Sequence, residues 1–345
     1  MQRQVVKDGF LNVRKPPGMS SHKCVQVVRK IFQTRHVGHG GTLDPMATGV
    51  LTMALGKATK FLQYLTSDKE YNGVIRFGVT TDSDDITGEV LSERAASWLT
   101  EQQVRTALQR YVGAIDQMPP RVSAIKKDGV RFYELARANQ VHTQIDVQAR
   151  RVHIDSIDLR QFTPGAYPET YIHVSCGAGT YIRSIARECG EALLVPHEHV
   201  DASCELRTVG GHFCVGGTLK ALERSRSGIF GLDTSLDFDE IRHKLEAGEN
   251  PLQPIDTGLA HLASVQLPMK KAHRWQIGGI SWIKSADVVP GGDSIDVPRG
   301  HYALAEGETI RVYSSESSPA FLGISQVEKQ PDHSDGYVLR TRTFA

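Results

Sequence analysis

The sequence lacks the features of a membrane protein and of a disulfide-rich secreted protein. It contains no run of eighteen consecutive apolar residues, although a membrane-spanning helix needs about twenty. Its N-terminal segment has no apolar core of the kind found in secretory signals. The five cysteines form no CxxC pair and show no spacing typical of a zinc site. We therefore expect a cytoplasmic protein with reduced thiols, no structural metal and no membrane contact.

The net charge of +1 gives little sign of a polyanionic partner, but the charges are unevenly distributed. Residues 1–60 carry ten Lys or Arg side chains and only two acidic ones, so the rest of the chain is net acidic. A nucleic acid bound to this segment would gain free energy from counterion release. A solvated basic surface would have the same composition, so charge supports nucleic-acid binding without establishing it.

One stretch, GHGGTLDPMATGVL at residues 38–51, contains a single charged side chain, Asp44, among four glycines. The glycines allow the backbone to take positive φ and to lie close to a ligand. Pro45 restricts Asp44 to an extended or turn conformation. A carboxylate presented in this way can act as a nucleophile or a general base. The residues alone also permit an Asp-Pro turn that is capped by its own side chain.

This stretch resembles the catalytic motif GHxGTLDPxATGVL of the TruB family of pseudouridine synthases at every specified position. The resemblance implies that Asp44 is the catalytic nucleophile and that His39 packs against RNA and helps to hold the target base out of its stack. The upstream segment KPPGMSS, residues 15–21, is similar to the family pattern KPxGxSS. The Lys-Pro pair of that pattern supports the active site, which adds Lys15 and Pro16 to the candidate site.

Two further segments resemble family motifs that reach the same site. Tyr71, in the segment DKEY, matches a family tyrosine that stacks on the target base and is proposed to take part in proton transfer. Without the resemblance, Tyr71 would be interpreted as a half-buried strand tyrosine. Arg183 ends the segment GTYIR, in which the family arginine pairs with the catalytic aspartate. We therefore predict an ion pair between Arg183 and Asp44.

The segment QMPPRVSAIKKDGVRFYELAR, residues 117–137, interleaves basic and aromatic side chains. Such a pattern suits phosphate contact and base stacking, although by itself an amphipathic surface segment would be slightly favoured. It resembles the family's RNA-gripping thumb, expected here at about 117–140, which implies that Arg121 and Lys126 bind RNA. A later segment, ELRTVGGHF, resembles the family's LRRTxxG with one arginine missing. That match implies that Leu206 lines the base pocket and leaves Arg207 without an assigned role.

Hydrophobic periodicity and capping residues predict the secondary structure. The acidic segment TDSDDITG, residues 81–88, is predicted to be a solvated turn, because its spacing does not match a calcium-binding loop. The C-terminal region from residue 267 is predicted to form short strands. The other expected elements are a strand at 10–13, a helix from Ser20 or Ser21 to about Phe32, a helix-capable stretch over 51–65, a strand over 71–79, a helix over 100–112, strands within 141–176, a helix ending at Gly190 and a helix ending at Gly248.

The resemblance covers most of residues 9–215 and implies the fold class. We expect an α/β (α+β) catalytic domain, residues 1–265, built around a mixed, largely antiparallel sheet with the thumb as an insertion. A small PUA-like β domain, residues 266–345, is expected to follow. Its assignment rests on length, position and composition, and an unrelated β-rich tail would fit these as well.

The resemblance also implies the reaction, which is isomerisation of uridine 55 in the tRNA T loop to pseudouridine without a cofactor or metal. The expected partner is the T stem-loop of tRNA, with no obligatory protein partner and a monomeric enzyme. One alternative is a guide-RNA-dependent pseudouridine synthase, but Ala47-Thr48-Gly49-Val50 follows the stand-alone pattern. Another is an RNA-binding or tRNA-folding protein with incidental catalysis, which the combination of Asp44, Tyr71 and Arg183 argues against.

Overall fold

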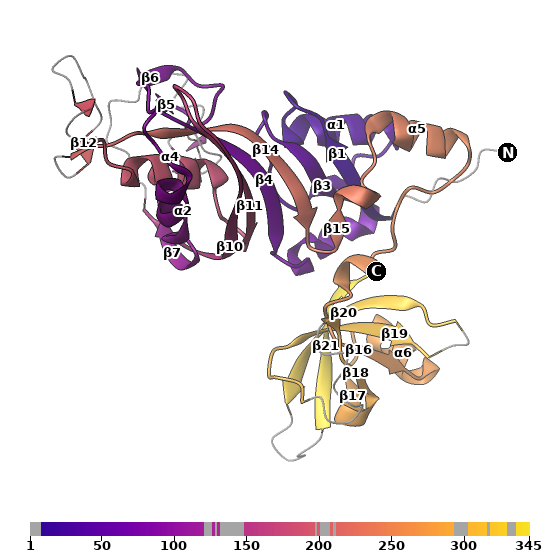
Figure 1. The fold of residues 1–345 in the computed structure, drawn as a ribbon. Helices are drawn as coiled ribbons and strands as arrows, with labels where there is room; N and C mark the ends of the chain where they lie inside the picture. The colour runs from indigo at the N-terminus through magenta and orange to yellow at the C-terminus, as the bar shows by residue number, and fades with distance from the viewer. Residues whose placement is uncertain are drawn as a thin grey trace.

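The computed structural model describes residues 8–120, 126–127, 130–131, 148–196, 199–200, 208–209, 212–292, 303–315, 318–329 and 336–345. Within these residues the chain forms a nine-stranded sheet and, after it in the sequence, a six-stranded sheet. Figure 1 shows the second sheet, in orange and yellow, beneath the end of the first sheet that carries β15. In this part of the chain no helix is long and apolar enough to cross a membrane.

The large sheet has the strand order β1-β3-β14-β4-β11-β10-β7, with β2 paired to β3 and β15 paired to β14. All of these neighbours are antiparallel except β3 and β14, which run parallel. The prediction of a mixed, largely antiparallel sheet is therefore confirmed. Its strands are β1 (Gly9–Lys15), β2 (Val37–His39), β3 (Thr48–Leu55), β4 (Lys69–Phe77), β7 (Gly113–Gln117), β10 (Arg150–Thr163), β11 (Glu169–Cys176), β14 (Gly217–Ser227) and β15 (Phe230–Gly231).

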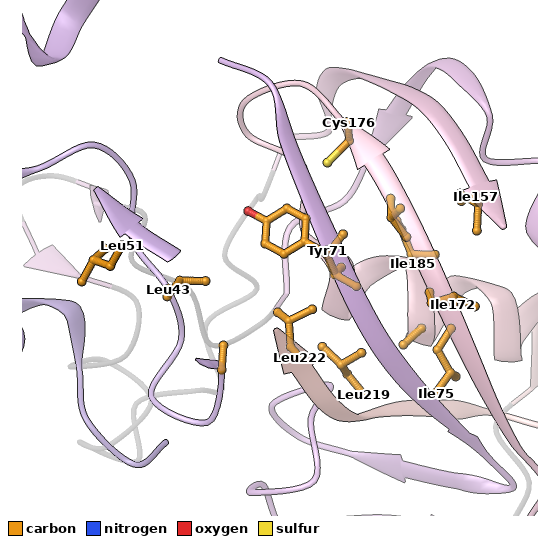
Figure 2. Packing of buried hydrophobic residues seen from close by; sticks show 14 of the residues in the cluster. Leu43, Leu51, Tyr71, Ile75, Ile157, Ile172, Cys176, Ile185, Leu219 and Leu222 are labelled. Carbon is orange, nitrogen blue, oxygen red and sulfur yellow. The ribbon is translucent and has the colours of Figure 1, made fainter. Parts of the chain in front are cut away.

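Two helices pack on one face of this sheet and enclose its core. α4 (Ile182–Ala192) lies against β14 and β4, and α2 (Glu101–Gln109) lies against α4 and β10. Alternate residues of β4, beginning with Tyr71, are buried on this face, as the period of two in a strand requires. Figure 2 shows Tyr71, Ile75, Leu219 and Ile185 meeting in this core.

The predicted helix after the first strand is present as α1 (Ser21–Ile31). Ser20 is its N-cap, since its side chain accepts a hydrogen bond from the backbone N–H of Lys23. α2 begins with the predicted capping box but ends at Gln109 rather than near residue 112. The helix expected to end at Gly248 is α5 (Phe238–Glu246), which lies beside α1 in Figure 1.

The prediction of a helix over residues 51–65 is wrong in its first part. The chain continues as β3 to Leu55 and then forms a 3₁₀ helix, η1 (Gly56–Tyr64). Nearly every residue of β3 is buried, because the strand is paired on both sides and packed on both faces. A short, continuous apolar run of this kind cannot be distinguished from a buried helix by its periodicity.

α4 also departs from its predicted end, because it passes through Gly190 and ends at Ala192. A β-carbon on Gly190 would lie 2.2 Å from the carbonyl carbon of Gly216 and from the backbone nitrogen of Gly217. This glycine therefore allows the helix to approach the start of β14 and does not terminate the helix.

The second sheet has the order β17-β21-β20-β19-β16-β18. The prediction of short strands holds for this region, but it missed the helix α6 (Met269–Gln276). Trp275 on α6 is fully buried and donates a hydrogen bond to Ser325 Oγ at 2.7 Å. The strands are β16 (Ser264–Leu267), β17 (Ser281–Lys284), β18 (Val288–Val289), β19 (Thr309–Ser314), β20 (Phe321–Lys329) and β21 (Gly336–Phe344).

The second sheet packs directly on η1 of the large domain. The ring of Phe61 lies 5.7 Å from that of Phe321, and both belong to a cluster that includes Ile324. The hydroxyl groups of Tyr64 and Thr343 are 3.1 Å apart. The remaining short elements are β5 (Val79–Thr81), β6 (Val90–Glu93), β8 (Lys126–Lys127), β9 (Val130–Arg131), β12 (Thr208–Val209), β13 (His212–Phe213), η3 (Leu232–Thr234), η4 (Thr257–Leu259) and η5 (Ser285–Asp287).

Candidate active site

Asp44 lies in the turn between β2 and β3, and this turn is fixed on both sides of the carboxylate. Before Asp44, the Ser21 hydroxyl accepts a hydrogen bond from Leu43 N and donates one to Leu43 O, at 2.8 and 3.0 Å. After it, Lys15 Nζ donates to the carbonyls of Pro45 and Ala47, at 3.0 and 2.6 Å. The aspartate is therefore presented by a backbone with little freedom to move.

Gly49 permits the close approach that brings β14 to this turn. Its φ is +96°, and a β-carbon there would lie 2.3 Å from the carbonyl oxygen of Arg224. A larger residue would therefore separate β3 from β14 at the point where the two strands pair in parallel.

Arg183, in the first turn of α4, holds the carboxylate of Asp44 at two points. Its Nη2 donates to Oδ1 at 2.9 Å, and its Nε lies 2.9 Å from Oδ2. The arginine side chain is 6% exposed and the aspartate side chain 30% exposed, so one side of the carboxylate remains accessible. The ion pair expected from the sequence is present, in the two-point geometry that fixes the direction of a carboxylate.

Two of the three aspartates in the acidic segment after β5 are buried and not solvated, which corrects the sequence-based prediction. Asp84 and Asp85 are 4% and 5% exposed because α4 presents two arginines to them. Arg183 Nη1 donates to the carbonyl of Ser83 at 2.8 Å and lies 3.6 Å from Asp85 Oδ2. Arg187, one turn later, donates to Asp84 Oδ2 at 2.6 Å. These pairings could not be read from the spacing of the acidic residues alone.

Asp44 and Tyr71 line a cavity of about 530 Å³. Figure 2 shows the Tyr71 ring directed toward the segment that carries Leu43, with Leu222 below the ring. Burial raises the pKa of Tyr71, while the guanidinium of Arg224 acts in the opposite direction, so the phenol keeps its proton at neutral pH. The other lining residues are Gly40, Gly41, Thr42, Leu43, Lys69, Arg150, Gly177, Ala178, Gly179, Thr180, Tyr181, Ile182, Arg183, Leu222 and Arg224.

Three predicted site residues lie near this cavity without lining it. Lys15 is 1% exposed, and its ammonium donates to backbone carbonyls, including that of Pro16 at 3.0 Å. His39 ends β2 and is half-buried. Burial lowers the pKa of His39 below its usual value, so its imidazole is neutral at pH 7. Lys15 thus supports the turn of Asp44, and Pro16 supplies one of the carbonyls that hold the Lys15 ammonium.

The other predicted site residues are Arg121, Leu206 and Lys126. Arg121 and Leu206 lie outside the described residues, as does most of the expected thumb. Lys126 belongs to the short strand β8, but its side chain is not among those described. In the part of the chain that the structure describes, no group of three or more His, Cys, Asp and Glu side chains is arranged to hold a metal ion.

Leu222 and Arg224, on β14, line the cavity and were missed by the sequence analysis. A signal for them exists in the segment LERSRSG, residues 222–228. It has Leu, Arg and Gly at the first, third and seventh positions of LRRTxxG, with Ser in place of Thr. The segment that begins at Leu206 lacks one residue of this spacing.

Comparison with known proteins gives the same family that the motifs indicated. The family described as "TruB family pseudouridylate synthase (N terminal domain)" matches residues 29–182. A protein named tRNA pseudouridine synthase B from Trichormus variabilis is 39% identical over 320 residues, which cover 93% of this chain and 94% of that protein. A protein of the same name from Gloeobacter violaceus is 42% identical over 271 residues, which cover 79% of this chain and 85% of that protein.

Solved structures show the same fold. A chain in the crystal structure of a Cbf5-Nop10-Gar1 complex aligns with a TM-score of 0.66 and 22% identity, covering 98% of this chain and 85% of that chain. A chain in the archaeal box H/ACA sRNP Nop10-Cbf5 complex aligns with a TM-score of 0.64 and 19% identity, covering 99% and 88%. At these identities the likeness concerns the fold alone. Given the extensive sequence identity to its curated relatives, the chain belongs to the TruB family of pseudouridylate synthases.

Proposed function

We propose that this chain isomerises uridine 55 in the T loop of tRNA to pseudouridine, with Asp44 as the nucleophile. The observation that carries the proposal is the two-point hold of Arg183 on an Asp44 carboxylate that faces a cavity. The names of the relatives support tRNA as the substrate, since each is called a tRNA pseudouridine synthase B.

The chemistry of the site fits this reaction. The ionised carboxylate of Asp44 attacks C1′ or C6 of the uridine, and the N1–C1′ glycosidic bond breaks. The base then rotates and reattaches through C5, which loses its proton while N1 gains one. The product is an isomer of the substrate and no electrons are transferred, so the reaction itself requires no cofactor. In this proposal Tyr71, which lines the cavity, stacks on the base and holds a proton next to it.

The target nucleotide must leave its stack before Asp44 can reach it, at a cost of a few kcal/mol. Leu222 and Tyr71 offer the extruded base an apolar wall and an aromatic face within the cavity. In this proposal Leu222 lines the base pocket, and the same role expected for Leu206, which lies outside the described residues, stays a prediction. In this proposal His39 and the thumb, with Arg121 and Lys126, offset the cost of extrusion by binding the surrounding RNA.

The organisation of the chain follows from the same proposal. Residues 1–265 form the catalytic domain, with the thumb at about 117–140, and residues 266–345 form a PUA-like domain that contacts the tRNA. The enzyme acts in the cytoplasm as a monomer on the T stem-loop, without an obligatory protein partner. The basic excess of residues 1–60 supports binding to a polyanion.

The test is to incubate the protein with unmodified tRNA and to map pseudouridine by carbodiimide chemistry. We expect one modified uridine in the T loop with the wild-type chain. We expect none with Asp44→Asn, which keeps the shape of the side chain but is a poor nucleophile. Asp158→Asn is a matched control, because Asp158 lies exposed on β10. Asp44→Asn turnover within tenfold of wild type would remove Asp44 from its role.

A protein that only binds or folds tRNA is the second candidate function. The same experiment separates the two, because that protein would bind the T stem-loop and leave its uridines unchanged. The Asp44–Arg183 pair favours the enzyme, since RNA binding alone does not call for a carboxylate facing the cavity.

A further inference from the structure

Arg224 is a buried cation that no carboxylate neutralises among the described residues. It is 1% exposed and lies in the middle of the large sheet, on β14. Its Nε donates to Val50 O at 2.7 Å and its Nη2 to Gly41 O at 3.2 Å, which fixes the plane of the guanidinium. In the described part of the chain, Nη1 makes no hydrogen bond of normal geometry, and the neighbouring side-chain partner of the guanidinium is the neutral hydroxyl of Tyr71, whose pKa the guanidinium lowers against the larger effect of burial. A buried charge without a counter-charge is costly, so its retention calls for an explanation.

Lys69, at the start of β4, lines the same part of the cavity wall as Arg224. A β-carbon on Gly41 would lie 3.4 Å from Lys69 Cε and 3.5 Å from Arg224 Nη1. Gly41 has φ of +139° and no side chain, so this part of the cavity stays open between the two cations. Among the described residues, the hydrogen-bond acceptor of Lys69 Nζ is the carbonyl of Ser67, at 2.9 Å.

The two cations are electrostatically unfavourable neighbours. Burial lowers the pKa of Lys69, and the charge of Arg224 lowers it further. Two like charges in a partly desolvated wall repel each other, and an anion placed between them would relieve the repulsion and supply the counter-charge that Arg224 lacks. Lys220 behaves differently, because Glu169 holds its ammonium at 2.7 Å through both carboxylate oxygens.

We propose that Arg224 and Lys69 form an anion subsite, next to Asp44, for a phosphodiester that flanks the extruded nucleotide. This inference rests on the proposed function and deepens it, because it names the RNA group that the cavity recognises beside the base. Arg224 contributes a fixed N–H donor and Lys69 a mobile ammonium. The subsite holds the sugar of the target nucleotide over Asp44 by its phosphate, and not by the base that must rotate.

The test combines protein variants with RNA hairpins that each carry one uncharged methylphosphonate, either 5′ or 3′ of the target uridine. Binding is followed by fluorescence anisotropy and product formation by single-turnover assays, with full-length protein throughout. The variants are Lys69→Met, Arg224→Lys and the control Lys220→Met, whose charge is already compensated. Circular dichroism and thermal melting check that each variant is folded. The Lys69 and RNA substitutions keep the test decisive even if Arg224→Lys does not fold.

We expect one of the two methylphosphonates to weaken binding or to slow single turnover by about tenfold or more with wild-type protein. Lys69→Met should show a similar loss on unmodified RNA and little further loss on that methylphosphonate. If the losses caused by Lys69→Met and by the methylphosphonate multiply when the two are combined, they are independent and the subsite is wrong. An equal loss for Lys220→Met would also overturn it. The binding data can also show that the methylphosphonate and Lys69→Met remove the same interaction while wild-type protein makes no pseudouridine. In that case the proposed function fails and the subsite stands.

Discussion

Asp85 Oδ2 lies 3.6 Å from Arg183 Nη1, so the arginine that holds Asp44 is itself next to a second carboxylate. The same Nη1 donates to the carbonyl of Ser83, which fixes the guanidinium from the side of the acidic segment. Asp85 is oriented in turn by Thr87, whose backbone N–H and hydroxyl donate to Oδ1 at 3.0 and 2.6 Å. The direction of the Asp44 carboxylate thus depends on a buried turn 41 positions further along the chain.

We predict that Arg183→Lys retains part of the single-turnover rate and that Arg183→Met loses nearly all of it. Lysine keeps the positive charge but not the planar two-point contact with Asp44. Methionine leaves Asp44 and Asp85 without their shared counter-charge. Removing one partner of a fully buried pair costs about 3–5 kcal/mol, and less is expected here because Asp44 is 30% exposed. Denaturant unfolding and single-turnover assays on tRNA check both effects, and a wild-type rate for Arg183→Met would contradict the assignment.

We predict that Asp85→Asn lowers the single-turnover rate while the tRNA dissociation constant stays within about threefold of wild type. The amide keeps the hydrogen-bonding shape but removes the charge that helps to place Arg183. Asp82→Asn serves as the control, because Asp82 belongs to the same turn and accepts a hydrogen bond from Glu89 N and not from Arg183. Equal rates for Asp85→Asn and wild type would show that Ser83 alone positions the arginine.

We predict that the wild-type rate falls as the pH rises through about 8, because burial lowers the pKa of Lys15 to about 8. Its three carbonyl acceptors need the three N–H donors of the ammonium, and the neutral amine has only two. Loss of the proton should therefore loosen the turn that carries Asp44. Single-turnover rates between pH 6.5 and 10 test this, since Lys15→Met should be slower and lack the step.

Unfolding caused by the same titration cannot explain such a loss. The unfolded chain keeps the Lys15 proton up to about pH 10.5, so between about 8 and 10.5 it binds more protons than the folded chain does. Rising pH therefore favours the folded state as far as this group is concerned. An unchanged step in Lys15→Met would assign the titration to another group.

We predict that Gly190→Ala destabilises the protein by about 1–3 kcal/mol, because the added carbon would meet the backbone of Gly216 and Gly217. Helix propensity alone predicts the opposite sign, since alanine stabilises a helix interior by about 1 kcal/mol relative to glycine. Gly165→Ala is the matched control, because a β-carbon there would meet nothing within 4 Å. The midpoint of urea unfolding distinguishes the two variants, and a stabilised Gly190→Ala would disprove the close contact.

We predict that Lys270→Gln combined with Arg274→Gln weakens tRNA binding and leaves the rate at saturating RNA unchanged. Both side chains are exposed on α6. If each contacts a phosphate, the slope of log affinity against log salt should fall by about two. Deleting the second sheet is a less suitable test, because it would remove Phe321 and expose the buried ring of Phe61 that packs against it. An unchanged slope would show that this helix does not contact the tRNA.

Local sequence determined the elements whose signals are complete within a few residues. Ser20 and the apolar face after it specify α1, and Thr100 with Gln103 specifies the start of α2. The stretch over 51–65 was misassigned because burial on both faces of β3 removes the alternation that marks a strand. α6 was missed because its short sequence is punctuated by Pro268 and Gly278.

The sequence by itself determined Asp44, Tyr71 and Arg183 as candidate site residues, because each lies in a contiguous segment that resembles a motif of the family. Only the tertiary structure decided what surrounds them. Arg224 enters the cavity because β14 pairs in parallel with β3, and its guanidinium donates to a carbonyl 174 positions earlier in the chain. Whether a charge is solvated, paired or left facing a cavity depends on which distant strands and helices pack against it, and no local pattern records that.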